Sequence, residues 1–90
     1  METEIARSLY YSPDADTLDI WLGDPSGETE AEPITENLVG KRNRHGEVIG
    51  FEIIALRRLN SEDMRKLPEA ARALLKESAA RLSIVRHPHK

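Results

Sequence analysis

The sequence predicts an α+β domain in which a small antiparallel sheet of about three or four strands, connected as a meander, packs against a C-terminal helix. Two segments with alternating apolar residues, 17–24 and 48–56, hold most of the side chains that could form a core. After residue 59 the apolar spacing changes from every second residue to the spacing of a helix. At 90 residues the chain has the length of a single domain.

Turn-forming residues separate the expected strands. A first strand over 8–11 ends at Pro13, which presets the backbone angle of a turn, and Asp14 and Asp16 suit the same turn. The second strand, 17–24, ends in the glycine- and proline-containing segment 23–27. Residues 28–33 are acidic and are expected to form a solvated connection or a weak edge strand. A third strand over 34–43 and a tight turn at Gly46 lead to the fourth strand, 48–56.

Helix signals follow residue 59. Asn60 or Ser61 is a suitable N-cap, and Pro68 suits the start of a second helix. That helix carries one apolar stripe, which is expected to lie on the sheet: Ala71, Leu74, Leu75, Ser78 and Leu82. The chain is therefore expected to be one domain, 1–90, with a sheet region over 8–59, a helical region over 60–84 and a flexible tail over 85–90.

The strand alternation predicts two apolar faces. One face, expected to lie under the helix, contains Leu18, Ile20, Leu22, Ile49, Phe51 and Ile53. The other contains Trp21, Val48, Gly50, Ile54 and Leu56, with Gly50 leaving room for the large ring. Exposed apolar patches rimmed by charge commonly mark protein contacts. Tryptophan is enriched among the interface residues that contribute most to the free energy of binding. This face therefore predicts a homodimer or a docked protein partner, unless the segment around Ile5 or the tail covers it.

The order of these elements resembles a known family. The run Tyr11-Ser-Pro-Asp-Ala-Asp-Thr-Leu-Asp-Ile-Trp-Leu22, an acidic stretch, and then His45-Gly-Glu-Val-Ile-Gly-Phe-Glu-Ile-Ile54 are similar to the bacterial domain of unknown function 2283 family over 9–59. The resemblance implies a small sheet packed on a helix and brings no established activity. Some relatives are encoded beside small toxin-like proteins, which implies an antitoxin-like role. This chain departs from the family in one place. Family members usually carry acidic residues just before the glycine turn, whereas this chain has the basic run Lys41-Arg-Asn-Arg-His45 there.

The charge distribution suggests an alternative. The net charge is -3, but the first 36 residues hold ten acidic side chains against Arg7 alone, whereas 37–90 hold twelve basic against six acidic ones. A strip of basic residues around the predicted hairpin could contact phosphates: Lys41, Arg42, Arg44, Arg57 and Arg58. The alternative function is therefore a nucleic-acid-binding regulator. The negative total charge and the absence of an aromatic stacking platform favour a protein partner over nucleic acid.

The sequence favours a binding protein over an enzyme, because no nucleophile and base occur in a catalytic pattern. The alternation places Glu52 on the face opposite its apolar neighbours, so we expect it to be exposed and not a general base. His87 and His89, even with His45, lack the further ligands of a metal site, and no cofactor is expected. With no cysteine, no signal-peptide pattern and no apolar run that could span a bilayer, we expect a cytoplasmic protein that does not contact the membrane.

Overall fold

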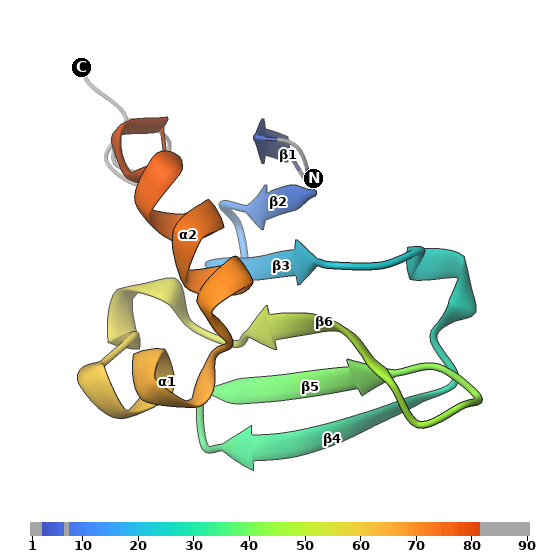
Figure 1. The fold of residues 1–90 in the computed structure, drawn as a ribbon. Helices are drawn as coiled ribbons and strands as arrows, with labels where there is room; N and C mark the ends of the chain where they lie inside the picture. Colours follow the sequence, from blue (N-terminus) through green and yellow to red (C-terminus); the bar gives the residue numbers. More distant parts are fainter. Residues whose placement is uncertain (1–2, 7, 82–90) are drawn as a thin grey trace.

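The computed structural model describes residues 3–6 and 8–81, which form an α+β domain built on one six-stranded sheet (Figure 1). All neighbouring strands are antiparallel, in the order β1-β2-β3-β6-β5-β4. The strands are β1 (Thr3–Ala6), β2 (Leu9–Ser12), β3 (Thr17–Trp21), β4 (Glu30–Thr35), β5 (Leu38–Arg42) and β6 (Val48–Ile53). The predicted α+β class, with an antiparallel sheet and a C-terminal helical region, is confirmed, with more strands than expected because β1 and β4 pair at the two edges. The predicted meander is wrong, because β3 pairs with β6 and not with the next strand along the chain.

Four short helical segments complete the fold. They are the 3-10 turns η1 (Pro25–Gly27) and η2 (Leu56–Arg58) and the α-helices α1 (Ser61–Lys66) and α2 (Glu69–Glu77). Asn60 caps α1 as predicted, and it does so in a capping box with Asp63, in which each side chain accepts a hydrogen bond from the other residue's backbone N–H. Pro68 precedes α2 and separates the two helices.

The core lies between the sheet and the helices. Leu9, Ile20 and Phe51 form one row across β2, β3 and β6, because the strand register places them side by side. The next row and the helices supply the other buried members of this cluster: Tyr11, Leu18, Leu38, Ile53, Leu56, Leu67, Ala71 and Leu75. The predicted core positions Leu18, Ile20, Phe51 and Ile53 are therefore confirmed.

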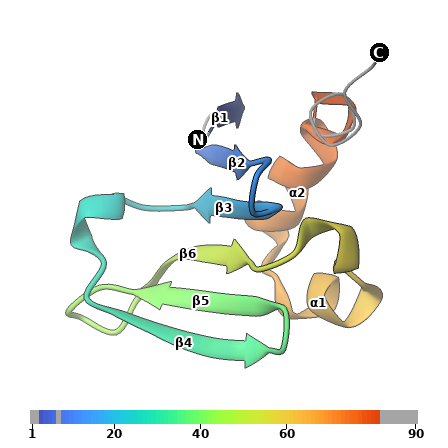
Figure 2. The same ribbon diagram turned by 180° about the vertical axis from the view of Figure 1, so that it is seen from behind.

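The helices α1 and α2 lie on one side of the sheet, toward one end, and the opposite face carries no helix in the described part of the chain (Figures 1 and 2). Two expected core residues lie at the margin of the covered side. Leu22 is 39% exposed. Ile49 is buried, but under the segment after β3, where a Cβ on Gly23 would lie 3.1 Å from its Cγ2 atom.

Two turns show why the strands end where they do. Gly46 has a φ of +80° in the turn between β5 and β6, as its position in the sequence predicts. Asp16 has a φ of +59° just before β3, a left-handed conformation that aspartate tolerates better than most residues. No helix among residues 3–6 and 8–81 is long and apolar enough to cross a membrane. The described residues do not include the predicted flexible tail or its His87 and His89. They also do not include residues 82–84, with Leu82, which the sequence predicts to be helical.

Candidate protein-interaction surface

The sheet face without helices carries a mixed aromatic and charged surface. We call it the open face. The strand register places Trp21, Gly50 and Lys41 in one row across β3, β6 and β5. The adjacent row contains Tyr10, Asp19, Glu52 and Val39, all of them partly buried. Strand alternation brings these seven residues to the same side of the sheet, opposite the core.

Trp21 packs directly over Gly50. A Cβ atom added to Gly50 would lie 2.6 Å from Cε3 and 2.9 Å from Cζ3 of the indole, and 2.8 Å from the backbone oxygen of Ile20. Carbon atoms in contact are normally separated by at least about 3.5 Å. The absence of a side chain at residue 50 therefore allows the ring to lie on the backbone of β6, as the sequence predicted.

Lys41 joins the indole to three carboxylates. Its Nζ atom lies 5.1 Å from the centroid of the Trp21 ring, within the range of a cation–π interaction. The same atom lies 3.9 Å from Oδ1 of Asp19, 3.8 Å from Oε1 of Glu28 and 3.8 Å from Oε1 of Glu52. These distances are those of ion pairs and are too long for hydrogen bonds. One ammonium is therefore shared by three carboxylates.

The predicted interaction patch is only partly assembled. Leu56 is wrong as a member, because it is buried in the core on the helix side. Val48 is 37% exposed and pairs with Arg42 at the end of the sheet, where the register shifts. Ile54 is 43% exposed and follows the other end of β6, about 20 Å away along an extended strand. Trp21 and Gly50 lie between them, but the charged pair Asp19 and Glu52 separates Gly50 from Ile54, so the apolar surface is not continuous.

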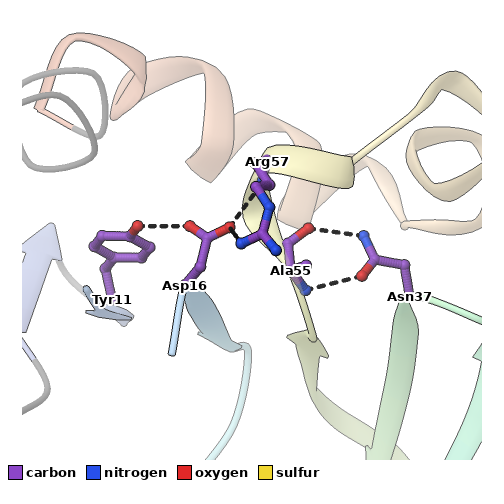
Figure 3. Close-up of polar contacts among 5 residues, drawn as sticks. All are labelled: Tyr11, Asp16, Asn37, Ala55 and Arg57. Atoms are coloured by element: carbon purple, nitrogen blue, oxygen red, sulfur yellow. Dashed lines mark hydrogen bonds and ion pairs between the residues drawn. The ribbon is translucent and has the colours of Figure 1, made fainter. Parts of the chain in front are cut away.

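Asn37 explains why Leu56 leaves the expected face. Its side chain accepts a hydrogen bond from the backbone N–H of Ala55 at 2.8 Å and donates one to the backbone oxygen of Ala55 at 2.9 Å (Figure 3). This pair of bonds ends the strand, and the chain enters η2. The alternation of side chains stops there, so Leu56 turns onto the core.

Asp16 holds the other side of η2. Its carboxylate accepts a hydrogen bond from the hydroxyl of Tyr11 at 2.6 Å, and two from Arg57, at 2.9 Å from the backbone N–H and 3.3 Å from Nη1 (Figure 3). Its backbone oxygen accepts from the N–H of Leu56 at 2.8 Å. Asp16 is therefore a tertiary link between residues far apart in sequence.

The predicted basic strip is divided between separate places. Lys41 lies in the open face, whereas Arg42 donates a hydrogen bond to Glu32 at 3.0 Å and another to the backbone oxygen of Gly46. Arg44 lies in the turn between β5 and β6. The grouping with Arg57 and Arg58 is wrong: Ile53 already pairs with Leu38 at the start of β5, so η2 lies at the opposite end of the sheet from Arg42.

The buried carboxylate of Asp63 also has a structural explanation. A hollow of about 460 Å³ between the β4–β5 turn and the start of α1 includes it in its lining. Its oxygens accept hydrogen bonds from Thr35 at 2.6 Å, from the N–H of Asn60 at 3.3 Å and from Asn37 at 3.5 Å. These bonds tie α1 to the β4–β5 turn. Among the described residues, no group of three or more His, Cys, Asp or Glu side chains could hold a metal ion.

The geometry defines a small sheet protein with one face covered by helices and one open, charged face. A family described as "Protein of unknown function (DUF2283)" has a sequence model that matches residues 9–57, more than half of the chain, and the chain belongs to this family. No curated protein and no solved structure matches the chain. The matched segment runs from β2 to η2 and contains every residue of Figure 3, whereas α1 and α2 follow it.

The sequence reasoning missed Tyr10, Val39 and Lys41 as neighbours of Trp21. The alternation of Tyr10 with the core residues beside it was available as a signal. The pairing of β3 with β6 and of β6 with β5 was needed to bring Lys41 to the indole. The pairing of β3 with β6 joins strands from distant parts of the chain and has no local sequence signature, whereas β5 and β6 form the predicted hairpin.

Proposed function

We propose that this protein is a non-catalytic binding module whose open face docks a partner protein with a basic surface. The observation that carries the proposal is the half-buried Trp21, lying over Gly50 on a face that no described helix covers. Tryptophan is enriched among the residues that contribute most to protein binding, which are surrounded by contacts that exclude water. Tyr10 and Val39 add apolar surface in the adjacent row.

The charge of the open face supports a basic partner. The carboxylates of Glu28 and Glu52 are both partly exposed and both lie 3.8 Å from the ammonium of Lys41, so they offer an incoming cation two negative charges. Complementary charge raises the rate of association and disfavours wrong partners. A second copy docking through the same face would bring two acidic clusters together, and nucleic acid would bring phosphates to them. The homodimer predicted from the sequence is thus the alternative occupant.

The antitoxin-like role implied by the family resemblance fits this proposal as one case, in which the basic partner is a toxin-like protein. Co-expression with the product of an adjacent gene tests it directly. We expect the wild-type protein to relieve the growth defect and the Trp21→Gln variant to fail to relieve it. Growth arrest that this protein does not relieve would remove the antitoxin role and leave the binding module to be tested separately.

The main experiment compares matched variants in an affinity capture from the host lysate, with nuclease treatment throughout. Trp21→Gln and Val39→Gln change the open face, and Ile34→Gln changes a residue on the other side that is 37% exposed. We expect one basic protein to be captured in stoichiometric amount by the wild type and by Ile34→Gln, and to be lost from both open-face variants. Circular dichroism checks that all three variants fold.

Sedimentation equilibrium of the purified protein completes the test. A monomer, with capture that weakens as salt rises, supports a basic partner on the open face. A dimer that Trp21→Gln dissociates would replace the basic partner with a second copy. Capture that persists in Trp21→Gln and Val39→Gln, or no capture by the wild type, would contradict the proposal.

A further inference from the structure

The outer edge of β4 is a second surface with a defined chemistry. This strand is the last in the sheet order, so one of its edges has no neighbouring strand in the described part of the chain (Figure 1). Its first five residues, Glu30 to Ile34, are all exposed. An edge strand presents unpaired backbone N–H and C=O groups, which can accept an additional strand. At six residues β4 is also longer than β1 at the opposite edge, which has four.

The side chains along this edge carry one sign of charge. Glu28, Glu30, Glu32 and Glu36 occur within or beside β4, and no lysine or arginine occurs between residues 28 and 40. Lys41 and Arg42 on β5 offset only part of this charge, through Glu28 at 3.8 Å and Glu32 at 3.0 Å. The edge is therefore acidic as well as open.

The same residues oppose pairing between two copies. An antiparallel pair of β4 strands would place glutamates beside glutamates, and like charges across a strand pair are destabilising. Pro33 removes one backbone donor from the strand and limits how far any added strand can pair. The glutamates thus oppose self-association without opposing a partner of the opposite charge, while Pro33 confines an added strand to part of the edge.

We infer that the edge of β4 binds an extended, basic segment of a partner protein by strand addition. Main-chain hydrogen bonds would supply affinity, and alternate side chains would supply specificity. Glu30 and Glu32 are two residues apart and lie on the same side of the strand, so alternating lysines or arginines on the added strand face them together. Apart from Glu28, which also lies beside Lys41, this surface shares no residue with the open face, and its occupation does not depend on Trp21.

The experiment uses a synthetic acetylated peptide in which lysine and threonine alternate over seven residues, titrated into the ¹⁵N-labelled full chain. We expect amide shifts concentrated on 30–35 and slower hydrogen exchange along β4. The double variant Glu30→Gln with Glu32→Gln should weaken binding by roughly two- to tenfold, since each cross-strand charge pair contributes modestly. The matched control is Glu62→Gln with Glu69→Gln, two exposed glutamates of the helical region, which should leave the affinity unchanged.

Two further peptides separate strand addition from plain charge attraction. A glutamate–threonine peptide should not bind. A lysine peptide of equal charge, interrupted by two prolines, should lose the exchange protection of β4 and most of the affinity. Equal binding of the interrupted peptide, shifts spread over the whole acidic surface, or no binding by the lysine–threonine peptide would overturn the inference. Trp21→Gln should leave the titration unchanged, so the outcome is independent of the open-face proposal.

Discussion

The indole of Trp21 occupies the space that any side chain at Gly50 would need. A Cβ atom at residue 50 would lie 2.6 Å from the ring, and the backbone oxygen of Ile20 closes the same space from another direction at 2.8 Å. The two residues face each other across β3 and β6, the strands at the centre of the sheet. Their contact therefore links the open face to the stability of the whole fold.

Gly50→Ala should destabilise the protein by about 1 to 3 kcal/mol, because overpacking forces the ring or the backbone to move. Urea unfolding followed by circular dichroism measures this change in the free energy of unfolding. The matched control is Gly27→Ala, where the nearest atoms to a new Cβ lie 4.0 Å away, and we expect little change. In a Trp21→Ala background the cost of Gly50→Ala should fall. An equal cost in both backgrounds would show that the ring is not the obstacle.

Tyr11→Phe should lower the free energy of unfolding by about 1.5 to 3 kcal/mol, the range for a hydrogen bond to a charged group. The hydroxyl of Tyr11 donates to Asp16 at 2.6 Å, in a place that is mostly buried. Tyr10→Phe is the control, since Tyr10 lies on the open face in the adjacent position of the same strand. Chemical denaturation with an unchanged m value measures both. A similar loss of stability in the two variants would show that the hydrogen bond from Tyr11 to Asp16 makes no particular contribution.

Asp63→Ala should cost about 2 to 4 kcal/mol, because it breaks the capping box with Asn60 and removes a buried carboxylate that accepts a hydrogen bond from Thr35. The neighbouring Glu62→Ala removes an exposed carboxylate from the same turn and should have little effect. Thermal unfolding of the two variants, compared with the wild type, tests the difference. Equal melting temperatures for the two variants would show that the buried network contributes nothing.

The pKa of Asp24 is held below its ordinary value by hydrogen bonds from the backbone N–H and then the hydroxyl of Ser26. Because folding lowers this pKa, the carboxylate stabilises the fold above its unfolded pKa, and the contribution is lost as pH falls through the folded pKa. Ser26→Ala removes only the hydroxyl and should raise the pKa part of the way. An NMR titration of the Asp24 carboxyl carbon measures this. An unchanged pKa in Ser26→Ala would contradict a contribution from the hydroxyl.

The sequence predicted the parts of the fold that depend on local patterns. Alternating apolar residues located β2, β3 and β6, and the capping residue Asn60 located the start of α1. The strand β4 lacks that signal because its side chains are acidic and face solvent on an edge. Leu56 was assigned to the wrong face because side chains alternate between faces only within a strand, and β6 ends at Ile53. The bonds from Asn37 that end the strand come from residues remote in the sequence.

The candidate site was predictable only in part, for the same reason. Trp21 and Gly50 could be paired by reading alternation along two strong strands. Lys41 could not be placed over the indole without the strand order, so its charge was assigned to a basic strip instead of an acidic cluster. The sequence therefore paired Trp21 with Gly50 but did not place the charged residues around them.

The strand order also has a consequence for the folding rate. The sheet consists of two locally connected halves, β1-β2-β3 and β4-β5-β6, which meet only where β3 pairs with β6. Within each half, strands that follow one another pair through short connections, whereas Ile20 and Phe51 are about thirty residues apart in the sequence. Closing that long loop has the largest entropic cost, so the joining of the two halves is expected to limit the rate of folding. Substitutions at Gly50, on this seam, should then slow refolding as well as lower stability.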